Sequence, residues 1–339
     1  IGVDIGGTFT DLIFYDDASG ESLVAKVPTT PASPDEGVVI AINETIPGDR
    51  VPAAEYFLHG TTVGINALLQ RQGAVVGLLA TEGFRDILEI RRGDRDEMYN
   101  LFWSPPPPLV PRRLRLPVKE RIRADGEVHI AQETADIRKA VAAFEEEGVN
   151  TIAIAYMNAY ANPAHEVEAE REVRAAGFKG EISLSHLVSG EYREYERTTT
   201  TVIDAYVRPR MTHYLRRLEE ELGKIGFTGR LLITRSGGGS MTFAEAEERP
   251  FETIMSGPVA GAEGAGELAR TLGIDELITA DVGGTSFDTC LVTGGRPQLM
   301  YEGKVVGLPV QTPWVDVRSI GAGGGSIAHI DVGGLLQVG

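Results

Sequence analysis

Two short segments of the chain repeat one pattern of acids, glycines and hydroxyls at the same spacing. Residues 4–11 read Asp-Ile-Gly-Gly-Thr-Phe-Thr-Asp, and residues 281–288 read Asp-Val-Gly-Gly-Thr-Ser-Phe-Asp. Apolar residues flank both copies, which predicts a strand, a glycine turn and a second strand in each. Because glycine has no side chain, the backbone N–H groups of such a turn can approach an anion closely. Two such turns indicate two lobes that hold one polyphosphate from opposite sides.

The glycines and hydroxyls of the two segments are the candidate phosphate ligands. The threonine in each turn can donate a hydroxyl hydrogen bond to a phosphate oxygen. The candidate nucleotide-binding residues of these segments are Gly6, Gly7, Thr8, Thr10, Asp11, Gly283, Gly284, Thr285 and Ser286. Two ordinary hairpin turns are the alternative, since Gly-Gly is also good turn chemistry. The acids and threonines that both copies share favour phosphate binding.

The first acid of each segment ends its strand beside the turn. Asp4 and Asp281 are therefore candidates for catalysis and for holding Mg²⁺, directly or through waters. Mg²⁺ in nucleotide sites keeps several waters and uses few protein carboxylates, so two acids suffice. The six histidines are scattered and form no cluster with the single cysteine, which disfavours a zinc site.

A third glycine-rich run, Ile-Gly-Ala-Gly-Gly-Gly-Ser, occupies residues 320–326. It could cradle phosphate through Gly323 and Gly324 or pass beneath a purine, and a flexible turn is the alternative. The chain contains neither Gly-x4-Gly-Lys-Ser/Thr nor Gly-x-Gly-x-x-Gly. A P-loop NTPase and a simple dinucleotide-binding domain are therefore disfavoured.

Residues 59–66, His-Gly-Thr-Thr-Val-Gly-Ile-Asn, leave a strand and enter a helix. Free N–H groups at a helix start attract anions, although Thr61 or Thr62 could simply cap the helix. His59 could be a general base or a histidine satisfied within the core. We count His59 and Thr61 among the candidate catalytic residues.

The elements that position these groups alternate between strands and helices, which is typical of the α/β class. Strands are predicted at residues 1–5, 10–15, 22–27, 56–59, 75–80, 151–156, 182–184 and 231–234. Helices are predicted at residues 34–46, 62–70, 136–147, 163–176 and 258–272. Residues 193–222 have helical spacing interrupted at Pro209, which predicts a helical pair linking the two lobes.

Two further segments have unusual composition. The helix at 258–272 is rich in glycine, which costs about 1 kcal/mol per helical position relative to alanine and indicates a close backbone approach, as at a lobe interface. Residues 91–117 combine arginines with four consecutive prolines. They could be a solvated excursion between lobes or a basic lining for an anionic substrate.

The overall composition restricts the class of protein. The chain has 339 residues, 42% of them hydrophobic, and a net charge of −17. This acidity disfavours nucleic acid as a partner but not ATP, which loops and a metal ion hold locally. The single cysteine, Cys290, permits no internal disulfide and is expected in the core. No long apolar run or signal peptide is visible, so we expect no membrane association and, by exclusion, a cytoplasmic location. The start at Ile1 and the glycine-rich end lead us to expect a truncated chain.

These motifs together resemble the hydantoinase A / 5-oxoprolinase family over almost the whole chain. The resemblance rests on the two repeated segments, His-Gly-Thr-Thr at 59–62, Gly-Phe-Arg-Asp-Ile-Leu-Glu-Ile at 83–90, Arg-Glu-Tyr-Glu-Arg-Thr at 193–198, Ser-Gly-Pro at 256–258 and Gly-Ala-Gly-Gly-Gly-Ser at 321–326. It implies the actin/Hsp70/sugar-kinase fold, with two ribonuclease-H-like lobes closing on ATP. We expect one lobe at residues 1–185 and a second, incomplete lobe at residues 186–339.

The resemblance also implies an enzyme that uses ATP and Mg²⁺ to hydrolyse a cyclic amide such as a hydantoin or 5-oxoproline. A hydantoinase B-like partner subunit or domain is implied with it, and we expect an oligomer. Some relatives instead serve as subunits of ATP-dependent ketone carboxylases. A small-molecule kinase and a nucleotide switch of the same fold are further alternatives. A kinase is disfavoured because no acid precedes the small-residue helix, where the chain reads Ser-Gly-Pro.

Overall fold

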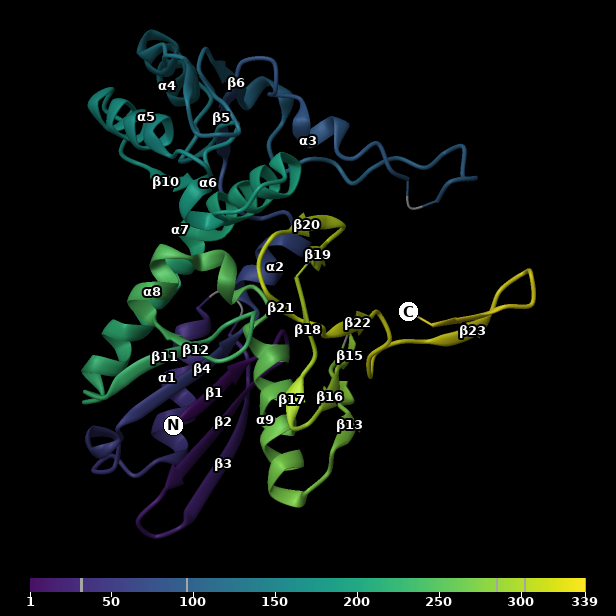
Figure 1. Ribbon diagram of the computed structural model, residues 1–339. Coiled ribbons are helices and arrows are strands. Elements are labelled where there is room, and N and C mark those ends of the chain that lie inside the picture. Colours follow the sequence, from purple (N-terminus) through teal and green to yellow (C-terminus); the bar gives the residue numbers. More distant parts are fainter. Residues whose placement is uncertain (31–32, 96, 285, 302, 339) are drawn as a thin grey trace.

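The first repeated segment forms the hairpin at the centre of a mixed sheet. A computed structural model describes residues 1–30, 33–95, 97–284, 286–301 and 303–338 (Figure 1). The strands of this sheet run in the order β12-β11-β4-β1-β2-β3. Their bounds are β1 (Gly2–Ile5), β2 (Phe9–Asp16), β3 (Glu21–Pro28), β4 (Tyr56–Thr61), β11 (Arg230–Thr234) and β12 (Ser240–Thr242). Helices α1 (Pro34–Thr45), α2 (Val63–Leu69) and α8 (Phe243–Glu248) belong to the same lobe.

This sheet crosses the domain boundary that we expected at residues 185 and 186. Strand β11 pairs in parallel with β4, so residues 230–242 belong to the first lobe. The boundary cannot be recognised from local composition, because the pairing joins strands separated by a whole domain in the sequence.

That inserted domain, residues 75–188, contains a parallel sheet in the order β10-β9-β5-β6. Its strands are β5 (Val76–Thr81), β6 (Arg115–Val118), β9 (Thr151–Ala155) and β10 (Glu181–Leu184), with a small hairpin of β7 (Arg121–Ile122) and β8 (Val128–Ile130). Its helices are α3 (Ile87–Ile90), α4 (Thr134–Glu146), α5 (Ala164–Ala175) and α6 (Ser185–Val188). Strands β5 and β9 are buried along their whole length, as expected when both faces of a parallel sheet are covered.

The expected helical pair is one continuous helix, α7 (Glu194–Lys224), which runs through Pro209. A proline inside a helix costs about 3 kcal/mol. Helix α7 packs against β9 and β10 of the inserted domain and against α1 and α2 of the first lobe, and most of its first fourteen residues are buried. This burial offsets the cost of the proline, which the local sequence could not indicate.

The second repeated segment lies in a smaller lobe beside α9 (Ser256–Leu272) (Figure 1). Its sheets are β13-β16-β17 and β14-β15-β22. Their bounds are β13 (Glu276–Ile278), β14 (Asp281–Val282), β15 (Phe287–Thr289), β16 (Leu291–Thr293), β17 (Arg296–Pro297) and β22 (Arg318–Ile320). The remaining strands pair two by two: β18 (Leu299–Met300) with β21 (Trp314–Val315), β19 (Gly303–Val305) with β20 (Leu308–Val310), and β23 (Ala328–Ile330) with β24 (Leu336–Val338).

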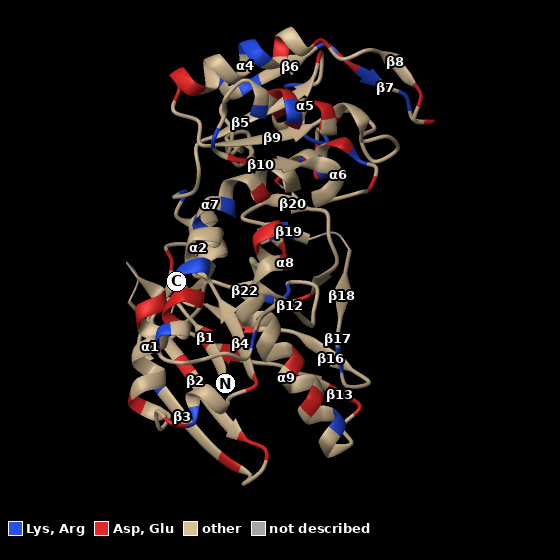
Figure 2. Cartoon of the chain, turned by 90° about the vertical axis from the view of Figure 1, so that its left-hand side faces the viewer, with Lys and Arg blue, Asp and Glu red and all other residues tan. Residues whose placement is uncertain are grey.

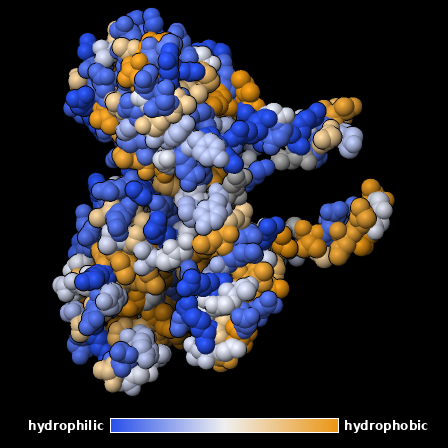
Figure 3. All heavy atoms as spheres, in the orientation of Figure 1, coloured by the Kyte–Doolittle hydropathy of each residue, from blue (hydrophilic) through white to orange (hydrophobic). Residues whose placement is uncertain are grey.

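The surface is mixed in charge and has two projecting segments. Acidic and basic positions both occur along α4, α5 and α9 (Figure 2). The projections are residues 97–104, where Tyr99 and Phe102 are almost fully exposed, and the β23–β24 hairpin, which is largely hydrophobic (Figure 3). Within the described residues, none of the helices combines the length and the apolarity needed to cross a bilayer.

Helix α9 makes the close approach that its glycines predicted, at two positions. A Cβ atom on Gly257 would lie 2.9 Å from Asp4 Oδ1, and one on Gly266 would lie 2.7 Å from the carbonyl oxygen of Gly295. In contrast, a Cβ atom on Gly261 or Gly264 would meet nothing within 4 Å. The tight contact with the first lobe is therefore concentrated at the N-terminal end of the helix.

Two alanine substitutions in this helix should have opposite effects. Gly257→Ala places a methyl group against the Asp4 carboxylate and should lower the free energy of unfolding by about 1–3 kcal/mol. Gly261→Ala has open space and should raise it by up to about 1 kcal/mol, because alanine is the better helix former. Urea unfolding of the full-length protein measures both, and equal effects of the two variants would contradict the proposed contact.

Candidate functional site

The two repeated segments fold into hairpins of the same register. Asp4 pairs with Asp11, and Asp281 pairs with Asp288, at matching positions beside the two turns. The amide of Gly6 donates to the Phe9 carbonyl, and the amide of Gly283 donates to the Ser286 carbonyl, both at 2.9 Å. Two segments 277 positions apart thus form the same turn. This shared geometry favours a common role over two unrelated hairpin turns.

The two turns face each other across the lobe interface. A Cβ atom on Gly284 would lie 3.3 Å from Thr8 Oγ1, so glycine permits this approach. Among the described residues, no group accepts a hydrogen bond from the amides of Gly7, Thr8 or Gly284. These N–H groups can therefore serve an anion placed between the turns. Thr285, a predicted phosphate ligand, lies outside the described residues.

The third glycine run supports the second turn rather than opening toward an anion. The amides of Gly324 and Gly325 donate to the carbonyls of Gly283 and Gly284, both at 2.9 Å. The amide of Gly323 donates to Ser326 Oγ at 3.0 Å. Because these amides already have partners, we assign Gly323 and Gly324 a positioning role instead of the phosphate-binding role suggested by the sequence.

Asp4 is the most unusual polar group of the site. Its Oδ1 is buried without a hydrogen-bond partner, and it lies against Gly60 and Gly257, whose Cβ atoms would come within 2.5 and 2.9 Å. Burial, and then the charges of Asp11 and Asp281, raise the pKa of Asp4 to about 6. A buried carboxylate oxygen with a second acid nearby fits a hydrated Mg²⁺, which needs few protein carboxylates.

Two other predicted ligands of the first segment point elsewhere. Thr10 is fully buried inside the lobe, and its hydroxyl lies 3.3 Å from that of Thr29. Asp11 forms an exposed ion pair with Lys26 at 2.8 Å. We therefore place neither side chain at the phosphates.

His59 occupies the core of the first lobe. It is fully buried, its Nδ1 lies 3.2 Å from the Val3 carbonyl, and its Nε2 lies 2.6 Å from Tyr214 Oη. Burial lowers the pKa of His59 to about 4. A general base needs access to the proton that it removes, so we assign His59 a structural role.

The amides that lead into α2 already have partners within the protein. The amide of Thr61 donates to Ser256 Oγ, that of Thr62 to the Ile5 carbonyl, and that of Val63 to Thr61 Oγ1. Thr61 is itself fully buried. These bonds tie β4, α2 and α9 together, which is a positioning function and not the catalytic one that the sequence suggested for Thr61.

A cavity of about 600 Å³ extends from the two turns toward α2 and the β19–β20 hairpin. Gly7 and Ser286 lie at the turns. Thr62 directly precedes α2, and Asn66 lies in the first turn of this helix. Asn66 is not among the candidate residues predicted from the sequence. Its spacing of four from Thr62 on a predicted helix was the signal that could have identified it.

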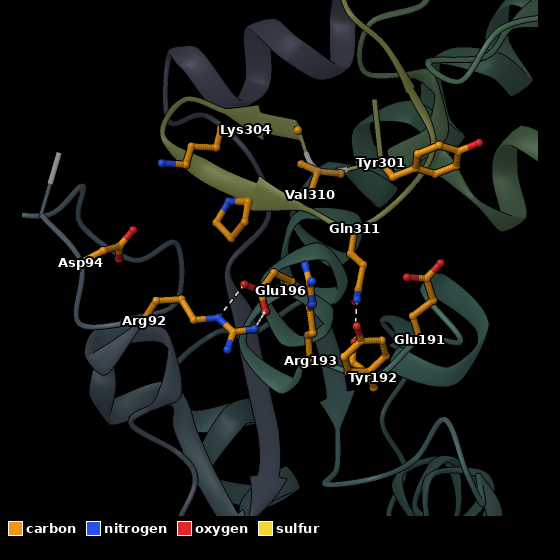
Figure 4. A pocket seen from close by; sticks show the side chains of 12 residues that line it. Arg92, Asp94, Glu191, Tyr192, Arg193, Glu196, Tyr301, Lys304, Val310 and Gln311 are labelled. Carbon is orange, nitrogen blue, oxygen red and sulfur yellow. Dashed lines mark hydrogen bonds and ion pairs between the residues drawn. The ribbon is translucent and has the colours of Figure 1, made fainter. Parts of the chain in front are cut away.

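A second cavity of about 560 Å³ lies on the other side of the same hairpin (Figure 4). Arg92, Arg193 and Lys304 line it together with acidic residues, and Arg92 donates two hydrogen bonds to Glu196. Other arginines of the 91–117 segment are used within the inserted domain, since Arg112 pairs with Asp86 and Arg115 is buried against Glu89. Arg112 and Arg115 therefore act in structural ion pairs, whereas Arg92 lines this cavity.

The chain is similar to known proteins over its whole length. The family model for the hydantoinase/oxoprolinase N-terminal region matches residues 1–177, and that for hydantoinase/oxoprolinase matches residues 197–339. Caprolactamase subunit alpha of Pseudomonas jessenii is 37% identical over all of this chain and 50% of its own length. The acetophenone carboxylase gamma subunit of Aromatoleum aromaticum is 35% identical over all of this chain and 49% of its own length.

The crystal structure of ATP-dependent caprolactamase from Pseudomonas jessenii has the same fold. It aligns with a TM-score of 0.89 and 36% identity, over 99% of this chain and 50% of the solved chain. The chain thus spans about half the length of the curated relatives and solved structure it matches.

The burial of His59 generates a prediction for stability against pH. Its pKa falls from an ordinary 6.5 to about 4 in the folded protein, so the unfolded chain binds more protons between these values. The contribution of His59 to the free energy of unfolding should therefore fall as the pH is lowered through this window, by about 3 kcal/mol at most. The raised pKa of Asp4 acts in the opposite direction, so the contribution of His59 is the difference in slope between the wild type and a variant that lacks this histidine. Urea unfolding from pH 7 to pH 4 measures this slope.

The matched variants are His59→Gln and His213→Gln, the latter on the exposed side of α7. His59→Gln should be less stable than the wild type at pH 7, and its free energy of unfolding should fall less than that of the wild type as the pH is lowered, whereas His213→Gln should keep the wild-type slope. An unchanged slope in His59→Gln would show that His59 is not held neutral.

Proposed function

Because the chain belongs to the hydantoinase/oxoprolinase family, we propose that it is the ATP-binding part of an enzyme that hydrolyses a cyclic amide. The observation that carries this proposal is the pair of matched turns that face each other at Thr8 and Gly284. Their free amides suit a triphosphate, and the adjoining cavity offers space for a second substrate at its end. The caprolactamase relative supports a cyclic amide as that substrate.

The proposed reaction overcomes the low reactivity of an amide by phosphorylation. The carbonyl oxygen of the ring bonds to the γ-phosphorus as the β,γ-bridging oxygen leaves with ADP. Water then adds to the resulting imidate carbon, and the ring C–N bond breaks as nitrogen takes up a proton, which leaves an acyl phosphate. A second water hydrolyses this acyl phosphate and releases phosphate and the ring-opened acid. Because a five-membered ring recloses readily, coupling to ATP cleavage drives the opening forward.

The residues of this chain act by binding and orientation. The amides of Gly7, Thr8 and Gly284 hold the phosphates, where fixed donors stabilise developing charge without reorganisation. Asp4 and Asp281 would hold Mg²⁺, which when bound neutralises negative charge on the phosphates. Ser286 and the β19–β20 hairpin close the space beside the turns. We further propose that the chain works with a partner subunit, since the relatives named above are themselves subunits.

A subunit of an ATP-dependent ketone carboxylase is the second candidate, because the acetophenone carboxylase gamma subunit covers this chain with 35% identity. Phosphate release from Mg-ATP distinguishes the two, using full-length protein with any co-encoded partner. Stimulation by lactams, hydantoin or 5-oxoproline with a matching ring-opened product supports the amide hydrolase. Stimulation only by a ketone with bicarbonate supports the carboxylase.

Asp281→Asn should lower ATP turnover by about 100-fold, because the metal loses one of its two carboxylates. The fold should survive, since Asp281 is exposed. Asp275→Asn, an exposed acid of the same lobe, is the control and should turn over ATP like the wild type. Wild-type turnover in Asp281→Asn would exclude Asp281 from the metal site.

Asp4→Asn should separate stability from activity. Removing an unpaired buried charge should raise the free energy of unfolding by up to about 3 kcal/mol in metal-free buffer, while ATP turnover is lost. Denaturant unfolding with EDTA and steady-state phosphate release measure the two properties. A variant that is both inactive and destabilised would contradict the unpaired state of this carboxylate.

A further inference from the structure

The cavity beside the two turns has two chemically different regions. One end touches the turns at Gly7 and Ser286, where the phosphates are proposed to lie. The other end lies between α2 and the β19–β20 hairpin, which are neighbours in Figure 1. We call this second region the acceptor chamber, defined by Thr62, Ile65, Asn66, Leu69, Val305 and Val306.

The geometry points to the acceptor chamber as the binding site of an uncharged cyclic amide, with Asn66 accepting a hydrogen bond from the ring N–H. This inference rests on the proposed function, because it gives the phosphoryl acceptor a place and a recognition residue. Asn66 would be a specificity residue, which binds the substrate without taking part in phosphoryl transfer.

The hydrogen bonds around Asn66 show which of its side-chain atoms can accept a hydrogen bond from a ligand. Thr62 Oγ1 donates its proton to the Ile5 carbonyl at 3.1 Å. Since a hydroxyl has one proton, Thr62 Oγ1 can only accept from Asn66, whose Nδ2 lies 3.1 Å away. The amide orientation of Asn66 is thereby determined. Its carbonyl Oδ1 is the acceptor that remains for a ligand.

The walls of the cavity favour a substrate without net charge. Lys304 and Asp288 contribute one positive and one negative charge to the lining, which cancel formally. Ile65, Leu69 and Val306 supply apolar surface on facing elements, which suits the methylene groups of a lactam ring. A ring that carries a carboxylate would lose hydration against these apolar walls.

The position of the chamber also fits the chemistry. A carbonyl oxygen must reach the γ-phosphorus, and the chamber opens directly onto the turns that are proposed to hold it. In a lactam the carbonyl carbon is bonded directly to the ring nitrogen. A lactam whose N–H donates to Asn66 on α2 would therefore hold its carbonyl oxygen in a fixed direction. Orientation of this kind lowers the entropy cost of a two-substrate reaction.

The test compares a lactam with its N-methyl derivative, which lacks the N–H but keeps the ring and the carbonyl. Caprolactam and N-methylcaprolactam are the probes, with full-length protein, its co-encoded partner and a non-hydrolysable ATP analogue. Calorimetric binding and, with ATP, phosphate release are both measured. The wild type should prefer the N–H lactam by about tenfold, the value of one hydrogen bond of about 1.4 kcal/mol.

Asn66→Ala should weaken binding of caprolactam by about tenfold and remove the preference over the N-methyl compound. Asn43→Ala, an exposed asparagine on α1, is the matched control and should keep both. The comparison of the two lactams on the wild type requires no variant, so it tests the inference even if Asn66→Ala fails to fold.

The outcomes separate this inference from the proposed function. Turnover of caprolactam with no preference for the N–H compound would overturn the role of Asn66 and leave the amide hydrolase in place. Binding with the expected preference but without turnover would uphold the chamber and overturn the hydrolase. Neither binding nor turnover of caprolactam would overturn the assignment of the chamber to an uncharged lactam, and stimulation by another cyclic amide would still support the hydrolase.

Discussion

The site depends on one carboxylate, that of Asp4, whose Oδ1 is buried without a hydrogen-bond partner. Asp4 ends strand β1 and is enclosed by Gly60 of β4 and Gly257 of α9, each of which leaves no room for a side chain. The rise of its pKa to about 6 corresponds to about 3 kcal/mol of unfavourable interaction with the charged form. The first lobe, the interface helix and the second turn all meet at this group, so the fold tolerates a local cost that a bound cation would offset.

The chemistry of the turns could be predicted from sequence because it is local. Each segment of eight residues contains its own glycines, hydroxyl and acid, and its hairpin register follows from alternating apolar residues on either side. The strands and helices of the first 80 residues were predicted for the same reason. The approach of Thr8 to Gly284 could be inferred only from the repetition of the pattern, since no local feature connects the two segments.

The roles of His59, Thr61 and the third glycine run depend on distant partners and were not predictable from their motifs. His59 is held by Tyr214, which lies 155 positions further along the chain. Thr61 is engaged by Ser256, and Gly324 is engaged by Gly283. In each case the residue type was compatible with catalysis or anion binding, but its tertiary contacts give it a structural role. The limits of the inserted domain were not predictable for the same reason, because only the pairing of β11 with β4 shows that the chain returns to the first lobe.

The β19–β20 hairpin connects the acceptor chamber to the inserted domain and to α7. Val305 and Val306 face the chamber, whereas Val310 and Gln311 line the cavity on the other side, and Lys304 borders both. Gln311 fastens this hairpin to α7, since its backbone amide donates to Thr200 Oγ1 and its Nε2 donates to the Tyr192 carbonyl (Figure 4). Because packed elements move as units and do not deform continuously, any displacement of the hairpin must change both cavities together.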